Sequence, residues 1–393
     1  MGRARGHVVA DGAAAERRHE SPAETARAAR GAAANFEAYR QQRFFTSLDG
    51  LRCLSIVAVI WHHAGVSEPS IPISTRGFLG VDMFFVLSGF LIVTLLLRER
   101  EQRGSIALRS FYARRALRIF PLYYAVVCGL VAALLFIRPE SRMAEPFFRE
   151  LPFHLTYTSN WIEVTTVLGI GWSLAAEEQF YFAWPPIERF LARFVVPILL
   201  LVIAVNQALN FRLIPLSNDT YESLEILQST FTPICLGVGL AHILHHHRGY
   251  ERFAWLLGGR WAVLVVAGSL LLLLCDPRDD ISGWPRLSMQ IAMTGLIGAC
   301  VVREKNPLAR FLCWAPVRRI GVVSYGMYLL HLFAMHGVDV LTERFDFEIV
   351  GQHFVLTLAA TWLVAEMSFR FWETPFLRLK NRFERVPRPT HTP

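Results

Sequence analysis

The stretch SLDGLRCLSIVAVIWHH, residues 47–63, is an apolar run with an arginine near its start and two histidines at its end. Arg52 and His63 are eleven residues apart, which along one α-helix is about 16 Å, roughly half the hydrocarbon core of a bilayer. Ionisable groups inside lipid are costly, so they usually mark a functional site. The stretch therefore predicts a membrane helix with a polar group towards each end, and the rest of the chain has to supply partners for its histidine.

The composition is that of an integral membrane protein. The 393 residues are 53% hydrophobic and only 18% charged, with a mean hydropathy of +0.35, which is too apolar for a soluble domain of this length. In such a protein a net charge of +8 indicates basic cytoplasmic loops and not a nucleic-acid partner. The six cysteines are scattered without the spacing of a disulfide framework or a zinc site. We therefore interpret them as small buried hydrophobes and expect no metal.

The two ends of the chain differ from the middle. Residues 1–42 are rich in Ala, Arg and Glu and lack the apolar core of a signal peptide, so we expect a mostly disordered cytosolic tail. The last part of this tail, Ala32–Gln42, is a candidate helix. Residues 43–377 are predicted to form one transmembrane domain, and residues 378–393 a basic cytosolic tail.

Hydropathy predicts an all-α, polytopic bundle of about ten spans. Nothing alternates with the period of two that membrane β-strands require. The expected cores are residues 51–66, 78–97, 117–137, 171–190, 194–210, 227–244, 261–275, 287–302, 320–336 and 350–370.

The basic residues between these spans predict the orientation. One alternating set of loops and tails holds 22 arginines and lysines, against 8 in the other set. Cytoplasmic loops carry the excess of basic residues, so the first set is cytoplasmic. Both termini then lie in the cytoplasm, as an even number of spans requires.

Three polar side chains are expected at similar depth in the outer leaflet. His63 lies near the outer end of the first span, Asp82 near that of the second, and Glu177 about two turns inside the fourth. A histidine with a carboxylate to orient it is what general-base catalysis needs. The alternative is that these groups only hold helices together. His62 is the rival of His63, because adjacent positions on a helix point about 100° apart.

The segment FYARRALRIFP, residues 111–121, leads into the third span from the cytosolic side. Arg115 and Arg118 are three residues apart and share one helix face. A guanidinium pair suits a phosphorylated ligand. The alternative is a topological anchor of the kind that cytoplasmic arginines usually provide.

Two further histidine sites are weaker. His245, His246 and His247 could bind a metal, but no Cys, Asp or Glu lies close by in sequence, so solvated histidines are favoured. His331 lies inside the ninth span, in SYGMYLLH, residues 324–331. It either lines the same cavity as His63 or packs as a satisfied core histidine.

Four segments in this order resemble the integral-membrane acyltransferase family three, the bacterial O-acetylases of lipopolysaccharide, exopolysaccharide, peptidoglycan and macrolide-type products. They are SLDGLR with His63, GVDMFFVLSGFLI (residues 80–92), FYARRALRIFP, and WSL (residues 172–174) followed by Glu177. The match runs from about Phe45 to about Phe376. The resemblance implies a multi-pass protein of the bacterial inner membrane that takes an acyl group, usually from cytosolic acetyl-CoA, to a hydroxyl, often of a glycan, on the opposite side.

The resemblance also implies roles for single residues. The arginine and histidine of its first motif fall on Arg52 and His63, and its arginine pair on Arg115 and Arg118. Its Ser-Gly pair falls on Ser88 and Gly89, and its fourth-span acid on Glu177. Ser88, Trp172, Ser173 and His331 are the substrate-binding candidates. The doubled histidine departs from the family pattern. The chain also ends soon after the tenth span, without the soluble extension of many relatives, so we expect direct transfer to the acceptor or to a separate partner.

The resulting hypothesis is that Arg115, Arg118 and Arg52 hold the phosphates of acetyl-CoA. His63 then deprotonates the acceptor or carries the acyl group, with Asp82 or Glu177 orienting its imidazole. The rivals are a proton-coupled transporter or flippase that uses the same buried groups, and a membrane scaffold subunit. Within the enzyme class, the acceptor is a lipid-linked or surface glycan or a smaller hydroxylated metabolite. A membrane lipid environment is implied throughout.

Overall fold

The computed structural model describes residues 35–42, 44–65, 71–215, 225–345 and 351–383. Within these ranges the secondary structure is helical and contains no strand, as the sequence predicts. Residues 1–42 and 43–393 form two separate units. The helices of the second unit are α2 (Thr46–Ala64), α3 (Pro72–Thr75), α4 (Leu79–Arg103), α5 (Leu108–Ala132), α6 (Ala144–Leu155), α7 (Gly171–Phe190), α8 (Val195–Asn210), α10 (Glu225–His245), α11 (His247–Leu257), α12 (Ala262–Leu274), α13 (Trp284–Val302), α14 (Ala309–Leu312), α15 (Ala315–Phe345), α16 (Gln352–Ser368) and α17 (Thr374–Lys380).

Each predicted span falls on one of these helices. Six helices are long and apolar enough to cross a membrane, and up to eight if each of two bent pairs counts as one span. One bent pair is α11 with α12, at 72°. Some helices, such as α7 with its two adjacent glutamates, carry polar side chains into the protein interior and are therefore less apolar than a lipid-facing helix. The helical bundle with candidate membrane spans is observed, while the count of ten spans with cytoplasmic termini stays a prediction.

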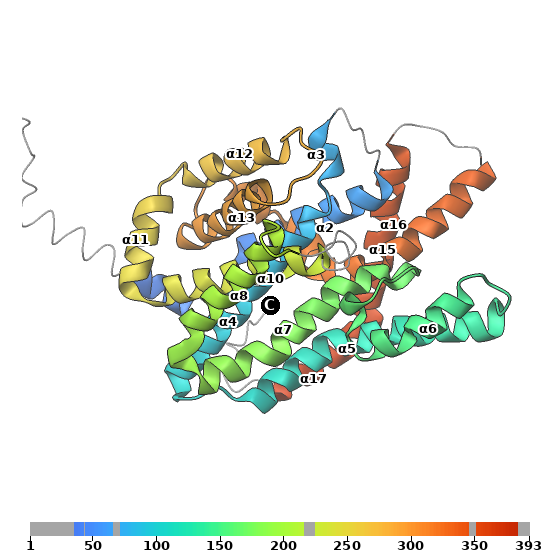
Figure 1. The fold of residues 1–393 in the computed structure, drawn as a ribbon, viewed down its shortest axis with the longest axis horizontal. Helices are drawn as coiled ribbons and strands as arrows, with labels where there is room; N and C mark the ends of the chain where they lie inside the picture. Colours follow the sequence, from blue (N-terminus) through green and yellow to red (C-terminus); the bar gives the residue numbers. More distant parts are fainter. Residues whose placement is uncertain (1–34, 43, 66–70, 216–224, 346–350, 384–393) are drawn as a thin grey trace, which may run out of the picture. The chain divides into compact units, whose positions relative to one another are not determined.

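Helix α4 is the centre of the bundle. It packs against α2, α7, α10 and α13, and most of its apolar stretch is buried inside the protein. A Cβ added at Gly89 of α4 would overlap the carbonyl oxygen of Ile234, and one added at Gly237 of α10 would overlap that of Val86. The glycine that follows Ser88 is thus explained by the close approach of two helix backbones. Figure 1 shows α4 and α10 running side by side, with α8 beside α10.

Helices α2 and α15 pack against each other and run in the same direction. Near their first turns, Gly321 meets the backbone of Asp49, and further along both helices His331 meets His63. This pairing brings two histidines that are 268 positions apart in sequence to the same end of the bundle. The outer helices α8 and α16 instead expose large apolar side chains such as Leu200, Leu201 and Leu363, as expected for surfaces that face lipid.

The predicted tails lie mostly outside the described residues. Of residues 1–42, the structure describes 35–42, where residues 35–41 form a helix in which Gln41 donates to Glu37 at 2.9 Å. The candidate helix at the end of this tail is therefore present over those residues. Of residues 378–393, the structure describes those up to 383, and they continue the helical path of α17.

Candidate active site

A cavity of about 90 Å³ lies between α2, α4, α5, α7 and α15. Its walls include six of the residues that the sequence singles out: Arg52, Ser88, Arg115, Arg118, Ser173 and Glu177. Three tyrosines that the sequence analysis did not select also line it: Tyr181, Tyr325 and Tyr328. Residues predicted from separate motifs therefore converge on one site.

Ser88 and Glu177 join two walls of this cavity. The Ser88 hydroxyl donates a hydrogen bond of 2.6 Å to the Glu177 carboxylate, from α4 to α7. A short bond from a hydroxyl to a carboxylate fixes both side chains. The adjacent residues Ser88 and Gly89 thus have different local functions: the glycine lets α10 approach, and the serine holds the acid in the cavity wall.

The arginines gather at one part of the cavity. Arg115 and Arg118 project from α5, and Arg118 lies within electrostatic reach of Arg52, Arg115 and Glu373. The Arg115 guanidinium stacks over the Tyr181 ring, 4.5 Å from its centroid, and Arg52 contacts Asp49 at 3.3 Å. Three guanidinium groups repel one another at this range, so the cluster favours an anionic ligand such as a phosphate.

His63 is paired with His331 and not with a carboxylate. Nδ1 of His63 lies 2.9 Å from the Val59 carbonyl oxygen and 3.3 Å from Nε2 of His331. Nδ1 of His331, which is fully buried, lies 2.6 Å from the Tyr328 carbonyl oxygen.

These contacts fix the tautomer of both neutral imidazoles. Because a carbonyl oxygen can only accept, Nδ1 of each ring carries the proton. Nε2 of His331 therefore offers a lone pair to the Nδ1 proton of His63, which is shared with the Val59 carbonyl. The lone pair of His63 then lies on its own Nε2, and His63 is an exposed residue, so a reactant can reach this atom.

The structure separates the two adjacent histidines. The His62 ring packs edge-on against Phe78, with centroids 5.6 Å apart, whereas the His63 ring lies 4.8 Å from that of His331. His62 therefore faces α4 and His63 faces α15.

Asp82 pairs with α13 and not with His63, so its orienting role stays a prediction. Its carboxylate, which is 1% exposed, accepts from Arg286 at 3.1 and 3.3 Å and from Gln290 at 2.8 Å, both on α13. Asp82 therefore contacts α13, whereas His63 contacts α15. Arg286 lies directly before the predicted span at 287–302, a position that could have suggested a buried partner.

Glu177 does not contact His63 either: its described hydrogen-bond partner is Ser88. Tyr328 separates Glu177 from His63. Its hydroxyl donates to the Ile170 carbonyl at 3.0 Å and lies 2.6 Å from the Ser173 hydroxyl. Tyr328 lines the cavity with its side chain and holds His331 with its carbonyl. The sequence motifs did not select Tyr328, although it lies one turn before His331 on the same helix face.

Trp172 packs against the cavity wall. The centroid of its ring lies 6.1 Å from that of Phe85, which lines the cavity. Of the triple histidine, His247 pairs with Glu251 at 3.4 Å. Over the described ranges, no group of three or more His, Cys, Asp or Glu side chains has the geometry to hold a metal ion.

Comparison with known proteins shows the family of this chain. A family profile described as an acyltransferase domain matches residues 45–366. The chain belongs to this acyltransferase family. The matched region contains every residue discussed above for the cavity except Glu373, and it contains both histidines of the pair.

Three curated relatives of this acyltransferase carry related names. They are the peptidoglycan O-acetyltransferase OatA of Listeria monocytogenes (30% identical, covering 85% of this chain and 56% of the relative), the O-acetyltransferase OatA of Staphylococcus aureus (27%, 85% and 57%), and the putative peptidoglycan O-acetyltransferase YrhL of Bacillus subtilis (28%, 86% and 55%). The acyltransferase chain thus spans a little over half the length of these relatives. No solved structure matches it.

Proposed function

We propose that this acyltransferase is an O-acetyltransferase of the bacterial inner membrane that moves an acetyl group from cytosolic acetyl-CoA to a hydroxyl of a cell-surface or lipid-linked glycan. The observation that carries the proposal is the continuity of the site. One cavity joins three arginines to Tyr328, and Tyr328 holds the histidine that pairs with His63. An anion site and a base that are linked through Tyr328 are the two groups that acyl transfer from a phosphorylated donor to a hydroxyl requires.

The arginine cluster supports a phosphorylated donor. Arg52, Arg115 and Arg118 would bind the phosphates of acetyl-CoA, since guanidinium groups bind phosphate through paired hydrogen bonds. The cavity volume of about 90 Å³ is below the roughly 300–1,000 Å³ of pockets that enclose a drug-sized ligand. Only the narrow thioester arm would therefore enter it, and the bulk of the donor would stay at the arginine end.

The histidine pair supports base catalysis at the other end. Nε2 of His63 would take the proton of the acceptor hydroxyl as its oxygen bonds to the acetyl carbonyl carbon. The carbon–sulfur bond then breaks, and the thiolate leaves with the proton from His63. A relay through an acetylated His63 would use the same lone pair. Tyr328 and Ser173 must separate for the thioester to pass, because their hydroxyls lie 2.6 Å apart.

Helix directions support ten spans with cytoplasmic termini. Helices α2 and α15, the predicted first and ninth spans, run in the same direction. Helices α4 and α7, the predicted second and fourth, also run in the same direction, because Ser88 meets Glu177 and Arg100 meets Glu188. Each pair lies an even number of spans apart in the predicted order, so a shared direction is what ten consecutive crossings would give.

The names of the relatives support a glycan acceptor, since one is a peptidoglycan O-acetyltransferase and another a putative one. The test is to supply the purified protein in lipid nanodiscs with radiolabelled acetyl-CoA and a soluble glycan. We expect labelled ester on the glycan, released by mild base, and no ester with a His63→Ala variant. Movement of unmodified glycan across a vesicle membrane without any ester formation would overturn the proposal in favour of a transporter.

A further inference from the structure

A second cavity, of about 330 Å³, opens between the end of α8 and the start of α13. We call it the α8–α13 cleft, lined by residues 210–212 on one side and by residues of the segment 278–285 on the other. Its volume falls in the range of small-molecule sites. It shares no residue with the arginine-lined cavity.

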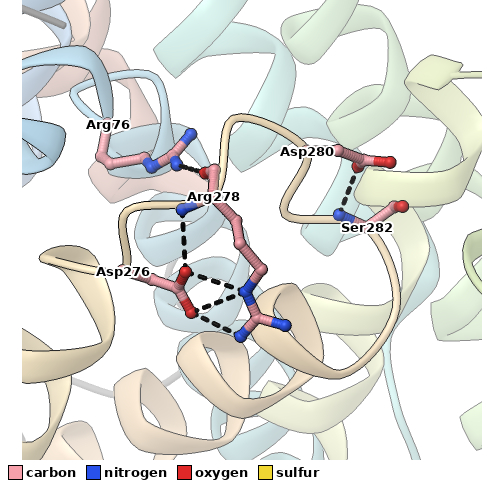
Figure 2. A network of polar contacts seen from close by, with 5 residues as sticks. All are labelled: Arg76, Asp276, Arg278, Asp280 and Ser282. Carbon is pink, nitrogen blue, oxygen red and sulfur yellow. Dashed lines mark hydrogen bonds and ion pairs between the residues drawn. The ribbon is translucent and has the colours of Figure 1, made fainter.

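Hydrogen bonds hold the loop of residues 276–283, which forms one wall of the cleft. Arg76 donates to the carbonyl oxygens of Arg278 and Asp279, and the Arg278 guanidinium clasps Asp276 with contacts of 2.6–3.2 Å (Figure 2). Hydrogen bonds from Arg278 lower the pKa of Asp276 to about 2, so this clasp persists at physiological pH. Asp280 accepts from the Ser282 backbone N–H at 2.8 Å (Figure 2).

The other wall is joined to this loop by two hydrogen bonds. Asn210 donates to the Gly283 carbonyl at 3.2 Å and accepts from its N–H at 2.9 Å. Gly283 has a φ of +74°, a conformation that glycine adopts without strain. A cleft whose walls are fixed before binding loses little conformational entropy when a ligand enters.

The chemistry of the cleft suits a sugar. Trp284 is 70% exposed, and Phe211 supports it edge-on with ring centroids 5.1 Å apart, which leaves an aromatic face open to the apolar C–H face of a sugar ring. Polar groups line the cleft around Trp284. The positive charges of Arg212 and Arg278 are offset by Asp280 in the cleft and by Asp276, which pairs with Arg278. This balance favours a neutral, hydroxyl-rich ligand over a polyanion.

Contiguous contacts connect the cleft with the histidine pair. Arg286, two residues after Trp284 on α13, stacks over the Phe78 ring at 5.7 Å. Phe78 packs against His62, the neighbour of His63. A chain of sugars in the cleft would thus lie at the end of the bundle where His63 exposes its base.

We infer that the α8–α13 cleft is a glycan-binding subsite, which holds sugar units of the acceptor next to the unit that is acylated. The inference rests on the proposed function for the identity of the acceptor. The alternative is that Trp284 only anchors α13 at the membrane interface, as exposed tryptophans often do.

The test is binding of a β-1,4-linked N-acetylhexosamine tetrasaccharide to the full chain in nanodiscs, without donor. We expect Trp284→Ala to weaken binding about tenfold or more, the usual effect of losing an aromatic hot spot, and Trp284→Phe to retain most of it. Asn210→Ala, which leaves the tryptophan in place but frees the loop, should also weaken binding. Trp255→Ala is the matched control, because Trp255 is 86% exposed on α11, and it should bind like the wild type.

Melting temperatures of all variants separate a binding defect from a folding defect. Equal affinity for Trp284→Ala and Trp255→Ala, or no binding by the wild type, would overturn the subsite. Binding that depends on Trp284 without any acetyl transfer would retain the subsite and overturn the proposed function. Acetyl transfer with the same KM in Trp284→Ala and Trp255→Ala would retain the proposed function and overturn the subsite.

Discussion

Nδ1 of His63 lies 3.3 Å from Nε2 of His331, and both rings hold their Nδ1 protons on main-chain carbonyls of their own helices. A histidine that the first motif predicts as a base is therefore oriented by a second, fully buried histidine. This arrangement places the reactive lone pair on Nε2 of His63 and leads directly to the first two predictions.

His63→Ala should abolish acetyl transfer, and His62→Ala should leave it nearly intact. A hydroxyl is a poor nucleophile at neutral pH, and removing a general base costs at least about a hundredfold in rate. His62 is the matched control, since it is the adjacent exposed histidine but packs on Phe78. The measurement is ester formation at equal protein levels. An active His63→Ala variant beside an inactive His62→Ala variant would contradict the assignment.

His331→Phe should lower kcat about two- to tenfold with little change in KM, because His63 loses one hydrogen-bond acceptor worth about 0.5–1.5 kcal/mol. His331→Gln should recover much of the rate, since its amide can both accept from His63 and donate. The pH dependence of kcat provides a second readout, which a purely structural role would leave unchanged. Identical kcat and pH profiles in the wild type and His331→Phe would show that His331 does not position His63.

Arg115→Ala and Arg118→Ala should each weaken acetyl-CoA binding by about ten- to a hundredfold, because each removes a charge-assisted phosphate contact of about 1.5–3 kcal/mol. Arg109→Ala, an exposed arginine near the start of the same helix, is the control for general loss of positive charge. Calorimetry on monodisperse protein measures the affinity. If all three variants bind the donor alike, the pair serves only as a topological anchor.

Asp82→Leu should destabilise the fold by about 3–5 kcal/mol, the effect of leaving a buried charge unpaired. The side chains of Asp82 and Arg286 are only 2% and 14% exposed. The double variant Asp82→Leu with Arg286→Met should recover most of the stability. Glu145→Ala, from a pair with Arg149 that is exposed on both sides, should change stability by less than about 1 kcal/mol.

Thermal unfolding in detergent measures these differences. Normal stability with loss of activity in Asp82→Leu would restore Asp82 to the chemistry.

Reporter fusions after residue 104, in the loop between α4 and α5, and at the C-terminal end should both report a cytoplasmic location, because basic residues concentrate there. A fusion at Arg212, in the predicted outer set of loops, should report the opposite side. A C-terminal fusion on the outer side would show that the chain crosses the membrane an odd number of times.

The sequence by itself determined the helices, the arginine face of α5 and the choice of the histidine at residue 63 as a candidate base. These depend on local properties, because the length of an apolar run and a rise of 1.5 Å per residue set the span of a helix and the depth of each side chain. Even the family motifs are local, and the cavity gathers residues from four of them.

Only the tertiary structure decided which side chains meet. Asp82 was expected at the depth of His63 but pairs with Arg286, 204 positions away, and the partner of His63 is His331, 268 positions away. The rotation of a helix about its axis and the choice of its neighbours depend on packing between distant segments, such as the close approach of α4 to α10 at Gly89 and Gly237. The depth of a side chain follows from its position along one helix, whereas a contact between side chains requires that two helices pack in a particular orientation.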